Sequence, residues 1–138
     1  MKINNFLTLI LLTISFSQNA FLDDLNTVSF DASVQPNNIR AGESIQLKLD
    51  VSIERKFHIY SVHPDLSLSP TNIEYADSNF FSVVGIINEP TPKTSYDENF
   101  DMVIAYLDGN FELTQGLVIN QELEPGEYEI EAVFSYLA

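Results

Sequence analysis

The chain has no cysteine and no tryptophan, and its 6 lysines and arginines are outnumbered by 20 aspartates and glutamates. Without cysteine, the 138 residues can form neither disulfides nor thiolate metal sites. The net charge of −14 has the wrong sign for contacts with nucleic-acid phosphates or an anionic membrane, which depend on lysine and arginine. We therefore expect no nucleic-acid partner, and we attribute the acidity to solubility outside the cell.

Motifs of catalysis and metal binding are also scarce. No G-x-S-x-G sequence marks a nucleophilic serine, and the two histidines, His58 and His63, have no third ligand for zinc. The segment Asp97–Asp101 resembles the start of a calcium loop, but Met102 replaces the required glycine and Asp108 replaces the twelfth-position glutamate. We expect His58 to lie in a strand, His63 to be exposed in a loop, and the chain to hold no metal, cofactor or catalytic residue.

A long apolar run is missing as well, and this bears on the N-terminus. The stretch Phe6–Phe16 is too short for the roughly 20 apolar residues of a membrane-spanning helix, but it suits the core of a signal peptide. A lysine precedes this stretch, and Ser15 and Ser17 are small residues at the positions that precede a cleavage site. The pattern predicts a signal peptide over residues 1–17, a lead-in segment over 18–26 and export to the periplasm. A buried N-terminal helix, the alternative, would need a polar face that this run lacks.

What the sequence does contain is a repeated alternation of apolar and polar residues, with the period of two that β-strands have. The alternation is clearest over Ile45–Ile53, and it recurs over Val28–Val34 and Tyr128–Tyr136. One face of each strand should therefore point to a core and the other to solvent. Shorter or weaker patterns over Phe57–Tyr60 and Thr71–Tyr75 predict two more strands.

Further strands follow from the second half of the chain. The apolar residues of Phe80–Ile87 are nearly continuous, which predicts a strand covered on both sides. Strands over Met102–Leu107 and Phe111–Ile119 flank Asp108-Gly109, a dipeptide typical of tight hairpins because it tolerates positive φ. About seven or eight strands without an amphipathic helix predict an all-β fold, an immunoglobulin-like antiparallel β-sandwich over residues 27–138. A small closed barrel is the alternative.

Glutamates crowd the last predicted strand and the turn before it. They are Glu122, Glu124, Glu127, Glu129 and Glu131. Paired carboxylates can act as acid and base, but only in a pocket that separates their pKa values. On the outward face of a strand they keep the strand solvated and hinder edge-to-edge pairing, which is the interpretation that we adopt.

The stretch Glu89–Asp101 combines two prolines and two aromatic residues, Tyr96 and Phe100, with several carboxylates. We expect a long polar loop over Pro90–Asn99. A loop of this kind can present a functional surface on a rigid sandwich. It can equally be an ordinary crossover whose aromatic residues pack against the core.

Several short segments form an ordered set: Phe57–Ser61, Ser69–Thr71, Glu89–Pro90, Tyr96–Phe100, Gly126–Tyr128 and Val133–Tyr136. In this order and at these distances they resemble the periplasmic N-terminal domain of DsbD, the thiol:disulfide interchange protein, in the version found in Bacteroidetes-like bacteria. The resemblance covers residues 28–138 and implies an immunoglobulin-like sandwich, in agreement with the strand pattern.

The resemblance also implies a function. The family's domain carries a cysteine pair that receives electrons from the membrane-embedded part of the same protein, which also has a thioredoxin-like domain. It passes the electrons to periplasmic thiol-disulfide proteins, and a cap loop shields the cysteines from stray oxidation. In this chain the cap loop would be formed by Tyr96, Asp97, Glu98 and Phe100, with Phe100 as the first choice for the capping aromatic residue. The full-length protein would be anchored in the inner membrane.

The chain departs from the family in one respect, because it has no thiol with which to attack a disulfide and should be inactive alone. In the family, the first cysteine follows a stretch like Phe134–Ala138. We therefore expect the cysteine pair directly after Ala138, in a longer protein of which this chain is a C-terminally incomplete part. One alternative is an exported immunoglobulin-like interaction or adhesion module without redox activity. Another is a carbohydrate- or peptide-binding sandwich, against which the lack of tryptophan counts.

Overall fold

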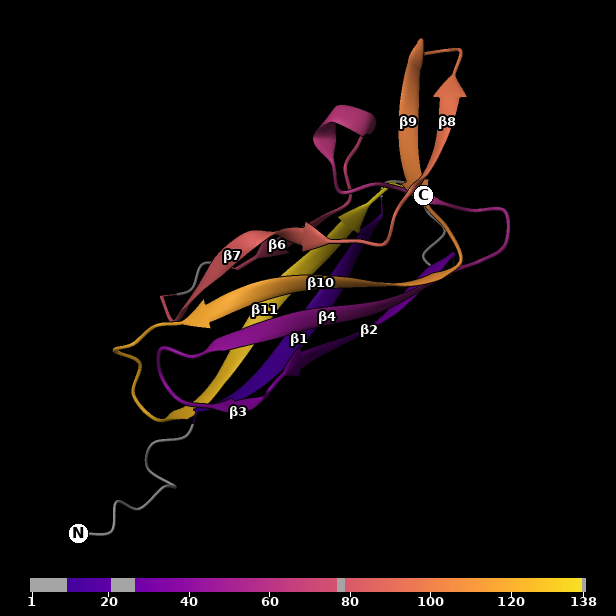
Figure 1. Ribbon diagram of the computed structural model, residues 1–138. Coiled ribbons are helices and arrows are strands. Elements are labelled where there is room, and N and C mark those ends of the chain that lie inside the picture. Colours follow the sequence, from indigo (N-terminus) through magenta and orange to yellow (C-terminus); the bar gives the residue numbers. More distant parts are fainter. Residues whose placement is uncertain (1–9, 21–26, 77–78, 138) are drawn as a thin grey trace, which may run out of the picture.

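The computed structural model describes residues 10–20, 27–76 and 79–137, which form three β-sheets (Figure 1). In spatial order, the first sheet consists of β3 (Asn38–Ile39), β1 (Ile10–Ala20), β11 (Gly126–Tyr136) and β6 (Asn72–Tyr75). The second consists of β2 (Val28–Gln35), β4 (Ser44–Ile53), β10 (Asn110–Ile119) and β7 (Phe81–Asn88). The third, smaller sheet consists of β5 (Ile59–Tyr60), β9 (Met102–Leu107) and β8 (Lys93–Asp97). A short 3₁₀ helix covers Pro64–Leu66.

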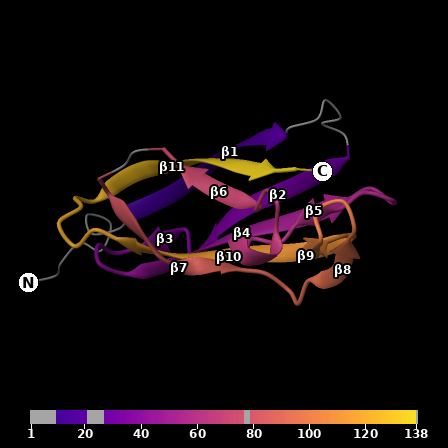
Figure 2. The same ribbon diagram turned by 90° about the horizontal axis from the view of Figure 1, so that it is seen from above.

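The two four-stranded sheets pack against each other as layers, which the view from above makes plain (Figure 2). This arrangement confirms the predicted all-β, immunoglobulin-like antiparallel β-sandwich. All described strand pairs are antiparallel except β1 and β11, which run parallel. The core between the layers is mostly aliphatic and also contains the rings of Phe134 and Tyr136. Its fully enclosed side chains include Leu47, Leu49, Leu113, Leu117, Ile119, Ile130 and Phe134.

Strand β4 is the central example of how the sequence pattern produces this core. Its odd-numbered residues from Ile45 to Ile53 are all buried, whereas Gln46, Asp50 and Ser52 are exposed. Because side chains alternate across a strand, this sequence can bury one face only. β4 pairs with β2 on one side and with β10 on the other, so its apolar face lies at the middle of the second sheet. The prediction for this strand is confirmed.

Strand β11 follows the same rule in the opposite layer. Ile130, Ala132, Phe134 and Tyr136 are buried, and the glutamates that alternate with them are exposed. The solvent-facing position predicted for the glutamates of residues 122–131 is therefore confirmed. The ring of Phe134 packs edge-on against Phe30 of β2, with 5.2 Å between ring centroids, and so connects the two layers.

Strand β1 is formed by residues for which the sequence predicts a signal peptide and a lead-in segment. Ile10–Ala20 pairs along its whole length with Gly126–Tyr136, and Ile10 and Leu12 are buried in the core. Residues 18–20 thus belong to a strand, while residues 1–9 and 21–26 lie outside the described residues. In this chain the segment completes the first sheet between β11 and β3. Removal of a leader remains a prediction.

Strand β7 differs from its prediction. The apolar run of Phe80–Ile87 indicated a strand covered on both sides, but β7 is the outer strand of the second sheet and most of its residues are exposed. The β10–β7 ladder shifts register between Thr114 and Gly116, and Gly85 has a φ of +72° at this irregularity. A run of apolar residues can form either an edge strand or a central strand of a sheet, so the sequence pattern alone could not distinguish the two positions.

The prediction that Asp108-Gly109 joins two paired strands of a hairpin is also wrong. Gly109 does have a positive φ of 69°, but β9 and β10 are not paired with each other. Instead the turn carries the chain from the small sheet to the second layer, and the carbonyl of Gly109 accepts a hydrogen bond of 2.8 Å from the amide of Ile53.

The long loop expected over Pro90–Asn99 is likewise corrected, since β8 (Lys93–Asp97) pairs with β9. Within the described ranges, no helix is long and apolar enough to cross a membrane.

Candidate functional site

The most prominent feature of the molecule is the hairpin of β8 and β9, which projects beyond one end of the sandwich (Figure 1). We call residues 93–107 the aromatic hairpin. Its ladder runs from the pair Lys93–Tyr106 at the base to the pair Asp97–Met102 at the tip. All four residues predicted to form the cap, Tyr96, Asp97, Glu98 and Phe100, lie at or next to this tip. The structure therefore brings them together on one element.

The aromatic side chains at the tip point into solvent. Tyr96 is 56% exposed and Phe100 is 58% exposed, and Val103 beside them is 47% exposed. Of the two arrangements that the sequence left open, the rings therefore do not pack back onto the core. An exposed cluster of large apolar side chains on a rigid scaffold is typical of a surface that contacts another group.

The tip is held in shape by its acidic residues. A carboxylate oxygen of Asp97 accepts hydrogen bonds from the amides of Asn99, at 2.8 Å, and Phe100, at 3.3 Å. The phenol of Tyr96 donates to the carboxylate of Asp101, whose own φ is +48°. The D-x-N-x-D pattern thus stabilises a turn, as aspartate commonly does by bonding to backbone amides two and three residues on. No group of potential metal ligands is found among the residues that the structure describes.

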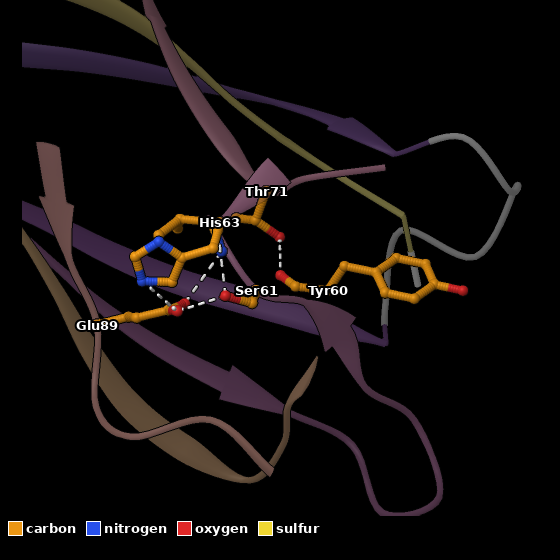
Figure 3. Close-up of polar contacts among 6 residues, drawn as sticks. Tyr60, Ser61, His63, Thr71 and Glu89 are labelled. Carbon is orange, nitrogen blue, oxygen red and sulfur yellow. Dashed lines mark hydrogen bonds and ion pairs between the residues drawn. The ribbon is translucent and has the colours of Figure 1, made fainter. Parts of the chain in front are cut away.

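At the base of the hairpin a buried carboxylate joins two loops (Figure 3). The side chain of Glu89, in the connection between β7 and β8, is only 3% exposed. It accepts a hydrogen bond from the hydroxyl of Ser61 and a bond of 3.1 Å from the amide of Val62. The hydroxyl of Ser61 in turn accepts a bond of 3.1 Å from the amide of His63. Each polar group here has a partner, which a buried charge requires.

Thr71 connects a third segment to the same cluster. Its hydroxyl donates to the carbonyl of Tyr60 at 2.6 Å, and its amide donates to the carbonyl of Ser61 at 3.3 Å. The amide of Ser61 donates to the carbonyl of Ala105 in β9 at 2.9 Å. We refer to Tyr60, Ser61, His63, Thr71 and Glu89 as the Glu89 cluster. It ties the start of the aromatic hairpin and strand β9 to the loop that follows β5.

The Glu89 cluster contains serine, histidine and a carboxylate, but it is not arranged as a catalytic triad. In a triad the histidine lies between the other two groups and accepts the hydroxyl proton of serine. Here Ser61 donates directly to Glu89, and Nε2 of His63 lies 3.5 Å from the same carboxylate oxygen. The histidine is therefore not placed to take the proton of the serine hydroxyl. The chemistry of the cluster is that of a hydrogen-bonded joint.

The two histidines can now be placed. His63 is 48% exposed in its side chain, as predicted for a loop position, although its contact with Glu89 was not foreseen. His58 precedes β5 rather than lying in a strand, so that prediction is wrong. It is exposed, and its ring lies 5.0 Å from the ring of Tyr106 in β9.

Two open hollows of about 630 Å³ and 570 Å³ border the base of the aromatic hairpin, and both are lined by Tyr106 and Asp108. Arg55 and Lys56 line the larger one. Lys93 forms an ion pair of 2.9 Å with Asp108 next to the smaller one, and this hydrogen bond raises the pKa of the lysine. Because that pair is solvent-exposed, it fixes orientation more than it adds stability.

Sequence reasoning found the tip but missed the joint beneath it. Ser61 and Glu89 were noted only as parts of separate segments, and nothing in their spacing indicated that they meet. Searches against protein-family models, curated proteins and solved structures found no match to this chain.

Proposed function

We propose that this chain is the scaffold and cap domain of an exported, DsbD-like thiol:disulfide interchange protein. In this proposal the aromatic hairpin covers a cysteine pair carried by residues that follow Ala138 in a longer protein. The observation that carries the proposal is the hairpin itself, whose tip presents Tyr96 and Phe100 more than half exposed beyond the end of the sandwich.

A second observation supports the proposal. Three of the segments that carry the family resemblance, Phe57–Ser61, Ser69–Thr71 and Glu89–Pro90, meet in the Glu89 cluster. Their hydrogen bonds set where the hairpin leaves the sandwich. If the similarity were due to chance, these three segments would not be expected to meet in one cluster at the base of the predicted cap.

The direction of β11 gives further support. Figures 1 and 2 both show this strand ending at the same end of the sandwich as that from which the aromatic hairpin projects, although the two belong to different sheets. β11 ends at Tyr136, so residues that follow it in a longer protein would begin close to the hairpin. A cysteine pair placed there would be within reach of an aromatic cap.

The proposed chemistry is an exchange of disulfides. The thiolate of one cysteine attacks a disulfide of a periplasmic partner, a mixed disulfide forms, and one partner sulfur leaves as a thiolate. The second cysteine then attacks the mixed disulfide and releases the reduced partner, which leaves the domain oxidised. The membrane-embedded part of the same protein returns two electrons to it. An apolar cap slows competing oxidation because thiol reactivity depends on access.

The experiment that tests the proposal is to read the gene beyond the codon for Ala138 and to assay the longer protein for reduction of a protein disulfide. A cysteine pair shortly after residue 138, followed by membrane-spanning segments, together with reductase activity, is the expected result. Further β-domains without cysteine would contradict it and favour the alternative, an interaction module in which the same aromatic tip contacts another protein.

A further inference from the structure

Strand β7 is an apolar edge strand on the side of the sandwich away from β2 (Figure 1). Among the described strands it pairs only with β10, so no described strand is hydrogen-bonded to its outer backbone edge, although Tyr75 of β6 contacts Phe81 with 5.6 Å between ring centroids. Val83 is 44% exposed, Val84 is 50% exposed and Ile86 is 69% exposed. Exposed edges of this kind usually carry a charge or a proline that prevents pairing. The sequence FSVVGIIN of β7 has neither.

Strand β7 carries no charged residue, although the molecule as a whole is strongly acidic. The chain has a net charge of −14, yet no charged residue stands between Asn79 and Asn88. Two copies of so acidic a protein repel each other over most of their surface. An uncharged edge is the part of the surface on which two copies can approach without bringing carboxylates together.

We infer that β7 is a self-association edge, on which a second copy of this chain pairs antiparallel through its own β7. A two-fold contact is isologous, so each group lies opposite a counterpart from the same strand. A charge near the two-fold axis of such a contact would lie close to its own copy, and cross-strand pairs of like charge are destabilising. The valines and isoleucines of β7 are β-branched residues, which suit the pleated, half-buried surface that a paired strand presents. The strand thus suits a copy of itself better than it suits a basic peptide.

The regular part of the edge sets the strength of this contact. Phe81–Val84 pairs residue by residue with Gly116–Ile119, and the ladder is irregular beyond Val84. A second β7 would therefore pair over a short stretch, and the resulting interface belongs to the small, weak class. We expect a reversible dimer that joins two four-stranded sheets into one continuous sheet and that strengthens when salt screens the net charge.

The test is sedimentation of the whole chain over about a hundredfold range of concentration, at low salt and at roughly 0.15 M salt, because a dimer in equilibrium depends on both. Val84→Lys should weaken dimerisation by about tenfold or more, since a lysine on an edge strand hinders its pairing with another strand. The matched control is Val103→Lys, which places the same charge at a similarly exposed valine on β9 and should leave dimerisation unchanged.

A second measurement does not depend on how well the lysine variant folds. Because the chain has no cysteine, Val83→Cys introduces a single thiol on the proposed two-fold contact. Mild oxidation should join two copies of this variant faster than two copies of Val103→Cys. A wild-type chain that stays monomeric at every concentration and salt, equal dimerisation of the two lysine variants, or equal cross-linking of the two cysteine variants would each overturn the inference.

Discussion

Ser61 and Glu89 are separated by 28 residues of sequence and joined by a hydrogen bond from the serine hydroxyl to a carboxylate that is almost completely buried. The same carboxylate binds the amide of Val62. This contact fixes the connection between β7 and β8 against the loop after β5, and the aromatic hairpin starts from it. The position of the exposed tip therefore depends on a joint that lies inside the molecule.

Removal of the carboxylate should destabilise the fold. Glu89→Ala leaves the hydroxyl of Ser61 and the amide of Val62 without their acceptor, and an unsatisfied buried polar group costs about 1–3 kcal/mol. The matched control is Glu98→Ala, which removes a glutamate from the exposed hairpin turn and should change stability by less than about 0.5 kcal/mol. Urea unfolding measures both values. Equal free energies of unfolding for the two variants would show that the joint contributes nothing.

Strand β1 allows a sharp comparison between neighbouring residues. Ile10 is fully buried, whereas Leu11, next to it on the same strand, is 38% exposed. Ile10→Ala should reduce the free energy of unfolding by about 2–5 kcal/mol, as expected for deletion of a buried aliphatic side chain. Leu11→Ala should cost clearly less, because that side chain lies on the outer face. If the two variants unfold alike, β1 does not pack in the sheet in solution.

The same comparison bears on the predicted signal peptide. Cleavage after Ser17 would remove most of β1 and expose the edge of β11 along which it lies. The intact mass of the exported protein therefore distinguishes a chain that begins at Gln18 from one that keeps Ile10 in the core. The sequence pattern of residues 1–17 predicts the mass of a chain that begins at Gln18. The burial of Ile10 and Leu12 fits the larger mass of a chain that keeps them.

A partly buried phenol should make stability depend on alkaline pH. Burial raises the pKa of Tyr75 above its ordinary value of 10.0, and its hydroxyl donates to the side chain of Gln115 at 2.7 Å. Because the folded pKa lies above the unfolded one, the stabilisation is fully present below the unfolded pKa and is lost as pH rises through the folded pKa. The free energy of unfolding should therefore begin to fall as pH rises past the unfolded pKa of about 10 and should keep falling above it.

Tyr75→Phe should lessen this fall with pH, because it removes the titrating group. It should also lower stability at neutral pH by about 1 kcal/mol, since Gln115 loses a hydrogen-bond donor. Tyr96→Phe, at an exposed tyrosine of the hairpin, is the control and should leave the fall with pH as it is in the wild type. A wild-type stability that stays flat as pH rises above the unfolded pKa would contradict the account of Tyr75.

The regular strands could be predicted because their apolar residues recur at every second position and these are the residues that the fold buries. Ile45–Ile53 can bury one face only, and the structure places that face in the core. The failures have physical causes. Residues 80–87 have the apolar composition that is typical of a central strand. Whether another strand pairs with their outer side depends on distant parts of the chain. The Asp108-Gly109 turn has the positive φ that its sequence predicts, yet that turn conformation does not determine which sheet the next strand joins.

The candidate site divides in the same way. The tip residues Tyr96 to Phe100 are close in sequence, so their proximity could be predicted, whereas the exposure of their rings could not, because a crossover packed on the core fits the same composition. The contact between Ser61 and Glu89 depends on where two loops meet after folding, and no local pattern contains that information. The parallel pairing of β1 with β11 is a long-range feature of the same kind.

The central claim is that the aromatic hairpin caps a thiol pair, and the rate at which those thiols react tests it most directly. The measurement is the rate of alkylation of the reduced cysteines in the longer protein, compared between the wild type, Phe100→Ala and the control Val84→Ala. Phe100 on the hairpin and Val84 on β7 are both at least half exposed, so neither change should affect folding by more than about 0.5 kcal/mol. We predict that Phe100→Ala raises the alkylation rate by about tenfold while Val84→Ala leaves it near the wild-type value, because access governs thiolate reactivity. Identical rates in all three proteins would contradict the claim that the hairpin is a cap.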